Sequence, residues 1–535
     1  MKPLRDLPWI LPCSLLLGLG LSLLSPCTWW IGWLAYAAVL AFGLWALALL
    51  WRSAETSGEQ NRNQPHRLWR QHVLGWMLLL AIVLRMGLGM AFSSILPAYG
   101  NDTEVQKAGY IFRDAYNRDV QSWELASSSN PLWRAFDKSY STDQYGGLLF
   151  VSSLLYRYIS PDAHRPWLII LLAALTAAIG VALAWKTADK LWGRSMALGV
   201  GWIMVLYPEA ILMGSSQMRE PFLVTLVAMA FWGVTSWAEN HRSSVAWMAG
   251  SLVGMLLFSP GIAAISIILL VGWIWLQRKE WRVRWWWVAG AGVIVLLAFL
   301  LLSWSVGGSL QVKSGPLATL VTWLKYTMNF DASLTTFNSG WLQTVFMSLP
   351  KPLHLPFIIA YGIAQPVLPA AIIDPGVWPV RLLGILRALG WYALIPLLLY
   401  SLLPIWKMTD KRQRLAWLWL WLVTWIWILL ASARAGGDQW DNPRYRVILL
   451  IFQAALAVKA LTWQRATHDR WLGRILAVEG VFLALFGYWY FTRKTILNMK
   501  IFNVFEVLAA IAVISAAILI TGWLRDRRQV KKEKR

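Results

Sequence analysis

The chain has 535 residues, of which 58% are hydrophobic and only 14% are charged, and its mean hydropathy is +0.52. This composition excludes an ordinary soluble globular domain and indicates a protein whose main solvent is lipid. The net charge of +23 does not indicate a nucleic-acid-binding protein, because the basic residues form short clusters between apolar runs and do not follow one face.

Apolar runs close to the ~20 residues that cross a bilayer as a helix recur along the whole chain. We therefore predict an all-α, polytopic integral membrane protein with about fourteen spanning helices. The first run follows Lys2 and Arg5 without a clear cleavage site, so we expect an uncleaved first helix. In chain order, the expected helices are 8–25, 28–51, 74–97, 165–185, 195–213, 221–238, 243–258, 260–277, 285–304, 383–404, 415–433, 446–463, 471–491 and 503–524.

The basic clusters predict the topology, since positively charged loops are retained in the cytoplasm. One choice of side places every cluster inside, together with the basic tail at 525–535, so both termini are expected to be cytoplasmic. The hydrophilic stretches then left outside are 98–146, 305–382, 434–445 and the tight turn 214–220. Two apolar segments, 145–158 and 353–372, are too short or too broken to span, and we expect them to be interfacial or re-entrant helices.

Loop 98–146 is the only long loop in which acidic residues outnumber basic ones. Asp102 and Glu104 lie two residues apart, so on an extended segment both carboxylates would point to one side. There they could act as a base and orient an acceptor, or hold a divalent metal ion. The alternative is a solvated loop with no chemical role. No Gly-rich phosphate loop, Cys-x-x-Cys pair or His-Glu-x-x-His motif occurs in the chain.

Several short segments occur in an order and on a predicted side that resemble a known family. They are Tyr99–Glu104, the Tyr-Gly-Gly-Leu-Leu run 145–149, Tyr207 with Pro208, the Ser-Ser-Gln-Met-Arg-Glu-Pro run 215–221, and the segment 438–446 with its Arg-Tyr-Arg ending. Together they resemble the GT-C glycosyltransferases, which depend on polyprenyl-phosphate sugars and include protein O-mannosyltransferases and aminoarabinose transferases. The resemblance covers roughly residues 74–465 in layout. It implies a catalytic module there, preceded by two helices and a cytoplasmic loop in 1–73 and followed by further helices and a basic tail in 466–535.

The resemblance implies that Asp102 and Glu220 are catalytic acids. Cations are needed for the departing phosphate, and guanidinium groups match phosphate bidentately. The substrate-binding candidates are Glu104, Arg219, Arg444, Tyr445, Arg446, Lys351 and His354. Each has an alternative role: an arginine at a helix end can anchor the span at the interface, and Glu220, before Pro221, can face the positive end of its helix.

The expected function is transfer of a sugar from a polyprenyl-phosphate donor to a glycan, lipid or protein acceptor on the outer face of the cell membrane. A many-span transporter or lipid flippase would have a similar composition, although its ionisable residues would be expected nearer the bilayer midplane. An envelope polysaccharide polymerase or ligase is a further alternative. The expected partners are therefore the lipid bilayer, the lipid-linked donor and the acceptor, and no nucleic acid.

Overall fold

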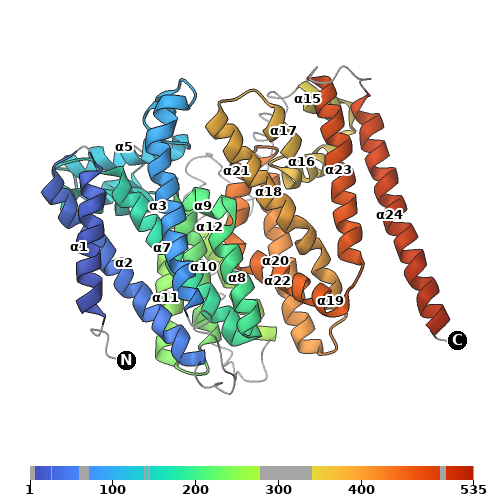
Figure 1. Ribbon diagram of the computed structural model, residues 1–535, viewed down its shortest axis with the longest axis horizontal. Helices are drawn as coiled ribbons and strands as arrows, with labels where there is room; N and C mark the ends of the chain where they lie inside the picture. Colours follow the sequence, from blue (N-terminus) through green and yellow to red (C-terminus); the bar gives the residue numbers. More distant parts are fainter. Residues whose placement is uncertain are drawn as a thin grey trace, which may run out of the picture. The chain divides into compact units, whose positions relative to one another are not determined.

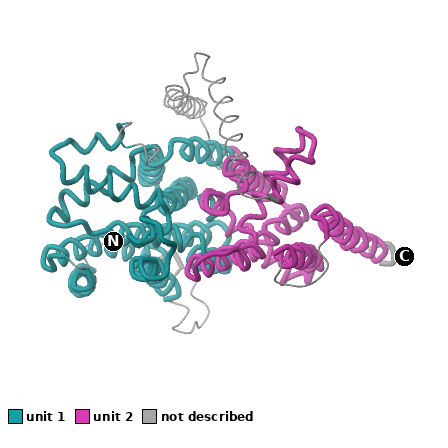
Figure 2. Tube along the Cα trace, turned by 90° about the horizontal axis from the view of Figure 1, so that it is seen from above, with its two compact units in different colours: residues 1–274, 282–302, 447–451 teal, residues 275–281, 303–446, 452–535 magenta. Residues whose placement is uncertain are grey.

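The computed structural model describes residues 6–25, 27–58, 72–137, 140, 145–276, 340–494 and 502–533. Every regular element in these ranges is a helix, which confirms the predicted all-α class (Figure 1). The chain divides into two compact units (Figure 2). Unit 1 comprises residues 1–274, 282–302 and 447–451, and unit 2 comprises residues 275–281, 303–446 and 452–535.

Unit 1 contains the first helices of the chain and the acid-rich loop, within which three short helices form. The helices of this unit are α1 (Leu7–Leu23), α2 (Trp29–Gly58), α3 (Val73–Tyr99), α4 (Glu104–Lys107), α5 (Arg113–Ser127), η3 (Leu132–Phe136), α6 (Gly147–Tyr158), α7 (Pro166–Trp192), α8 (Arg194–Leu206), α9 (Pro208–Gly214), α10 (Glu220–Thr235), α11 (His241–Phe258), α12 (Pro260–Leu276, whose last two residues belong to unit 2) and η6 (Val447–Leu449). Helices α2, α3, α8 and α10 all pack against α7, most of which is buried.

Unit 2 holds most of the remaining helices. They are α15 (Gly340–Ser348), α16 (Lys351–Ala364), α17 (Leu368–Ile373), α18 (Trp378–Tyr400), α19 (Leu402–Trp406), α20 (Lys411–Ala435), α21 (Asp441–Arg446), α22 (Leu450–Thr467, whose first two residues belong to unit 1), α23 (Trp471–Arg493) and α24 (Val504–Glu533). The predicted helix 285–304 and the part of loop 305–382 before residue 340 lie outside the described residues.

Eight helices within the described ranges are long and apolar enough to cross a membrane, and a bent pair would make a ninth. Three shorter apolar helices, α1, α10 and α12, match predicted spans by position. The eight are Trp29–Ala54, Val73–Tyr99, Pro166–Trp192, Trp378–Trp406, Lys411–Ala435, Asp441–Thr467, Trp471–Arg493 and Val504–Gln529. The chain is therefore a polytopic α-helical membrane protein.

The prediction of one continuous helix over 195–213 is wrong. The structure has two helices, α8 and α9, bent by 56° at Tyr207. Pro208 has no N–H, so it cannot donate to the carbonyl of Met204 one turn earlier. Instead, the buried side chain of Arg85 in α3 donates from Nη2 to Met204 O at 3.0 Å and from Nη1 to Val205 O at 3.5 Å.

The loops of unit 1 gather at two opposite ends, as alternating spans require. At one end, Lys186 donates to Ser53 Oγ at 2.6 Å and Lys190 pairs with Glu239 at 2.9 Å. At the other end, Arg165 donates to Thr28 O at 2.8 Å, which joins the start of α7 to the turn between α1 and α2. The second end also holds turn 214–220, where Gln217 donates to Pro166 O at 3.3 Å, and the described part of loop 98–146, where Arg118 donates to Gln217 O.

Candidate active site

Asp102 lies on the surface at the start of the acid-rich loop. Its carboxylate is 87% exposed and pairs with the ammonium group of Lys107. The hydrogen bond from Lys107 and the positive charge of the same group lower the pKa of Asp102 below its ordinary value of 3.8. Asp102 is therefore ionised at neutral pH and open to an acceptor that arrives from solution.

The expected extended arrangement of Asp102 and Glu104 is not what forms. Thr103 caps α4, its hydroxyl accepting from Gln106 N at 3.3 Å, and Gln106 Oε1 in turn accepts from Asn101 N. This is a variant of the capping box, and it makes Glu104 the first residue of the helix. Glu104 accepts a hydrogen bond from the Tyr116 hydroxyl at 2.7 Å, so the two carboxylates have separate partners. The bond to Glu104 raises the pKa of Tyr116.

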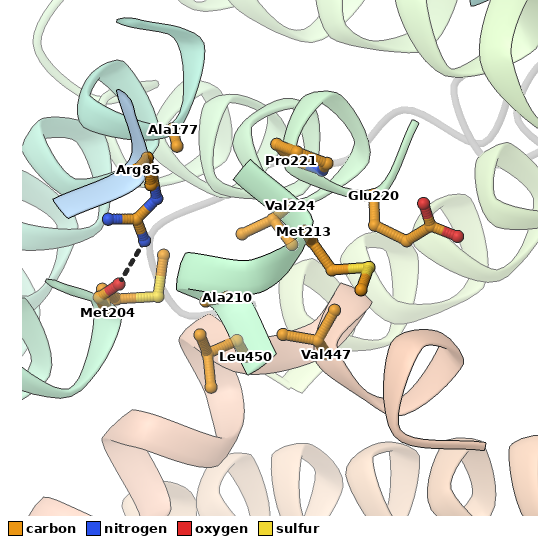
Figure 3. Close-up of a pocket in the computed structure, with 10 residues that line it drawn as sticks. All are labelled: Arg85, Ala177, Met204, Ala210, Met213, Glu220, Pro221, Val224, Val447 and Leu450. Carbon is orange, nitrogen blue, oxygen red and sulfur yellow. Dashed lines mark hydrogen bonds between the residues drawn. The ribbon is translucent and has the colours of Figure 1, made fainter. Parts of the chain in front are cut away.

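Glu220 is in the opposite environment. It is the first residue of α10 and is fully buried. It lines a cavity of about 20 Å³, roughly the space of one or two water molecules, together with Arg85, Met204 and Val447. Figure 3 shows that the Glu220 carboxylate points away from the Arg85 guanidinium, which turns toward Met204. The exposed Asp102 and the buried Glu220 therefore have different surroundings, and Asp102 does not line this cavity.

Two of the segments that carry the family resemblance meet in unit 1. The guanidinium of Arg219, 9% exposed and directly before α10, lies 5.2 Å from the ring centroid of Tyr145. Tyr145 precedes Gly146, which caps α6 with φ of +71°. A Cβ at position 146 would lie 2.4 Å from Ala135 O, so only glycine fits this turn. The Tyr-Gly-Gly segment is thereby fixed against the Arg-Glu-Pro turn.

A buried acid that the sequence analysis did not single out organises the loop. Asp119 on α5 is fully buried and accepts hydrogen bonds from the hydroxyls of Tyr110 and Tyr156, while His164 Nε2 lies 2.8 Å from its Oδ2. These residues come from α5, the loop before it, α6 and the segment before α7. Burial and the negative charge of Asp119 raise the pKa of both tyrosines well above 10.

The same cluster ties the loop to turn 214–220. Gln217, also fully buried, donates to Pro166 O at 3.3 Å and to the Tyr156 hydroxyl at 3.4 Å. Arg118, next to Asp119, donates to Gln217 O at 2.7 Å. Loop 98–146 and turn 214–220 are therefore in direct contact, through the bond from Arg118 to Gln217.

The arginines of segment 438–446 lie in unit 2 and have different surroundings. Arg444 pairs with Asp441 at 3.1 Å and its guanidinium lies 5.0 Å from the ring of Tyr445. Arg446 is 1% exposed, donates to the carbonyls of Ile363 and Gln365 at the end of α16, and stacks at 3.8 Å on Trp391. Arg446 thus caps a helix end. Arg444 is also buried, at 7% exposed, whereas Tyr445 is half-buried.

Lys351 and His354 lie in the first turn of α16. Lys351 is exposed, whereas the His354 ring contacts Phe346 at 3.8 Å and its Nε2 lies 2.9 Å from Leu349 O. His354 therefore has local partners that account for its position.

A metal site receives no support from the described residues. No group of three or more His, Cys, Asp or Glu side chains that could hold a metal ion occurs among them. Asp102 and Glu104 engage Lys107 and Tyr116 instead.

No protein-family model matches this chain, and no curated protein matches it at a significant level.

Proposed function

We propose that the chain is a membrane glycosyltransferase that moves a sugar from a polyprenyl-phosphate donor to an acceptor on the extracytoplasmic face. The observation that supports this most is the contact between Arg219 and Tyr145, because it joins two segments of the family-like pattern that are far apart in the sequence. An exposed carboxylate, Asp102, lies in the same external loop region. The assignment to sugars depends on the resemblance described above.

In the proposed reaction, the acceptor oxygen attacks the anomeric carbon, and the bond between that carbon and the phosphate oxygen breaks. Asp102 accepts the hydroxyl proton, and the lipid phosphate leaves with the bonding electron pair. Arg219 is the candidate cation for the phosphate in unit 1, and Arg444 with Tyr445 is the candidate pair in unit 2. Because Lys107 lowers its pKa, Asp102 is a weak base that takes the proton late, as the new bond forms.

The proposal includes a topology. We propose about fourteen spans, both termini in the cytoplasm, and loop 98–146 and turn 214–220 outside, in the cell membrane. The basic residues Lys186, bonded to Ser53, and Lys190, paired with Glu239, at one end of unit 1, and the acid-rich loop at the other, support this orientation.

The test is transfer by the purified chain in lipid nanodiscs, supplied with radiolabelled polyprenyl-phosphate sugars and envelope glycan, lipid and peptide acceptors. We expect a labelled product with one donor, and loss of about a hundredfold in turnover for Asp102→Asn. Asp137→Asn is the matched control, since it makes the same change at another exposed acid of this loop. Failure of every donor to give a product, or equal turnover in both variants, would contradict the proposal.

A transporter is the second candidate, and two observations favour it. Arg85 is 2% exposed inside a spanning helix, and the pair α8 and α9 is bent by 56° beside it. Buried ionisable groups and broken helices mark substrate pathways in transporters. Proteoliposomes that accumulate a labelled lipid-linked sugar without forming any glycoside would favour this candidate over the enzyme.

A further inference from the structure

A second cavity in unit 1 lies where loop 98–146 meets turn 214–220. Its volume is about 70 Å³, and it is lined by residues of α3, α7, the α4–α5 connection and the turn. Neither Asp102, Glu220 nor Arg219 lines it. By the space that one water molecule needs, it has room for roughly five or six water-sized groups. That is enough for one edge of a sugar ring and too little for an isoprenoid chain.

The polar groups of this cavity retain acceptor capacity. The hydroxyl of Ser93 donates to Met90 O at 2.7 Å, and those of Ser215 and Ser216 donate to Leu212 O at 2.8 and 3.1 Å. Each hydroxyl has therefore used its one hydrogen and keeps lone pairs on oxygen. Gln217 uses its NH₂ group on Pro166 and Tyr156, and its buried Oε1 has no hydrogen-bond partner among the described residues.

The lack of charged lining residues and the aromatic lining limit the kinds of ligand that this cavity can bind. No Asp, Glu, Lys or Arg is among the lining residues, so a phosphate finds no counter-charge here. Aromatic rings of Phe92, Tyr110 and Trp167 also line the cavity. The Tyr110 ring is fixed by its bond to Asp119 and by Gly109, whose φ is +84° and whose side-chain position is filled by Ser93 Cα at 2.7 Å.

We propose that this cavity binds one edge of the ring of a neutral sugar through its hydroxyl groups. The hydroxyls supply donors for the unused acceptors of Ser93, Ser215, Ser216 and Gln217, and the aromatic rings contact the C–H groups of the same edge. The proposal rests on the proposed glycosyl transfer, for which it supplies a sugar-binding site separate from the charged groups that act on the phosphate.

The experiment measures binding of methyl pyranosides of mannose, glucose, galactose and arabinose to the full chain in lipid nanodiscs, free of glycoside detergent, by saturation-transfer NMR. The variant Ala108→Trp adds bulk at an exposed residue that lines the cavity, and Gln217→Leu removes the buried acceptor. Ser129→Trp is the control, since it adds the same bulk at an exposed site of the loop that does not line the cavity. We expect at least one pyranoside to bind, tenfold or more weaker binding in both cavity variants, and unchanged binding in the control.

Three results would overturn the inference. The first is the absence of binding by every pyranoside at tens of millimolar, and the second is equal binding by wild type and Ala108→Trp, which would place the sugar elsewhere. Displacement of a bound pyranoside by inorganic phosphate at millimolar concentration would also contradict a neutral site. The failure of this inference and the failure of the proposed function give different results. Pyranoside binding that Ala108→Trp weakens, without any sugar transfer, would refute the glycosyltransferase and keep the sugar site. Sugar transfer without such binding would refute the sugar site and keep the glycosyltransferase.

Discussion

The guanidinium of Arg85, in the middle of α3, donates to the main-chain oxygen of Met204 at 3.0 Å. That oxygen has lost its helical partner, because the residue four positions later is Pro208. A buried arginine therefore compensates for a proline, and it stabilises the break between α8 and α9 just before the turn that carries Arg219 and Glu220.

Replacement of Arg85 by Met should lower the stability of the chain by about 1–3 kcal/mol, because Met204 O is left without a donor in an apolar region. Pro208→Ala restores an N–H at the position that can bond this oxygen. In the Arg85→Met background, Pro208→Ala should therefore recover about 1 kcal/mol, whereas alone it should have little effect. Thermal unfolding of the four proteins in nanodiscs gives the coupling. Strictly additive changes in apparent Tm would show that Arg85 does not act through this break.

The Asp119 cluster predicts a loss of stability at alkaline pH. The pKa values of Tyr110 and Tyr156 are raised above 10 by burial and by the charge of Asp119. A raised pKa means that the folded state binds the proton more tightly, so the stabilisation is complete below pH 10 and is lost as the pH rises beyond it. Tyr156→Phe should make the fall in apparent Tm above pH 10 shallower than in wild type. Tyr158→Phe, which changes an exposed residue of the same helix, should leave the slope unchanged. Equal slopes in all three proteins would show that the cluster does not govern the alkaline limit.

The helices could be predicted from the sequence because the length of a span is fixed by the bilayer. The predicted range 74–97 and the observed helix Val73–Tyr99 differ by one or two residues at each end. The break at Pro208 had a signal, the missing N–H, and the lone Arg85 in an apolar run was a sign of a buried polar partner. The Asp119 cluster had no signal in the sequence beyond the acidity of its loop. Its residues come from four segments that meet only after α5, α6 and α7 have packed.

The surroundings of the candidate site residues could be predicted only in part, because they too depend on contacts between distant segments. The sequence could place Asp102 on an exposed loop, but it could not show that Lys107 pairs with it or that Thr103 starts a helix between the two acids. Arg444 and Arg446 have equivalent positions in the sequence pattern. Their surroundings differ because Arg446 donates to carbonyls at the end of α16, a contact between segments distant in the chain.

Arg446 and Arg444 should respond differently to the same substitution. Arg446→Lys loses the planar fork that bonds the carbonyls of Ile363 and Gln365 and the stacking on Trp391, so it should lower stability by about 2–3 kcal/mol. Arg444→Lys should lower stability by less and should weaken binding of a polyprenyl-phosphate donor. Equilibrium binding to equal amounts of folded wild-type and variant protein measures this effect. Normal donor affinity in Arg444→Lys would show that Arg444 does not bind the donor and has a structural role, which includes its ion pair with Asp441.

The proposed topology predicts which engineered cysteines are accessible from outside the cell. In a chain with Cys13 and Cys27 replaced by Ala, Ser129→Cys should react with an impermeant maleimide in intact cells or spheroplasts. Thr409→Cys, exposed in the loop before α20, should react only after the membrane is permeabilised. The reverse pattern would place the acid-rich loop in the cytoplasm and exclude an extracytoplasmic site.

The pairing of Asp102 with Lys107 predicts the pH dependence of the proposed reaction. A lowered pKa means that the carboxylate is present throughout the range above 3.8 and is lost only as the pH falls below that value. In wild type, kcat/KM should therefore stay independent of this group down to about pH 4, and the activity should fall only below that pH.

Lys107→Gln removes the hydrogen bond and the charge that lower the pKa of Asp102. The fall in activity at acid pH should therefore move up toward pH 3.8, and the carboxylate should become a somewhat stronger base. Asp102→Asn should lower turnover by about a hundredfold and leave donor binding intact. Arg113→Gln, a change of another basic residue in the same loop, is the control for a general loss of positive charge. If Lys107→Gln and Arg113→Gln give the same profile as wild type, Asp102 is not the group that accepts the proton.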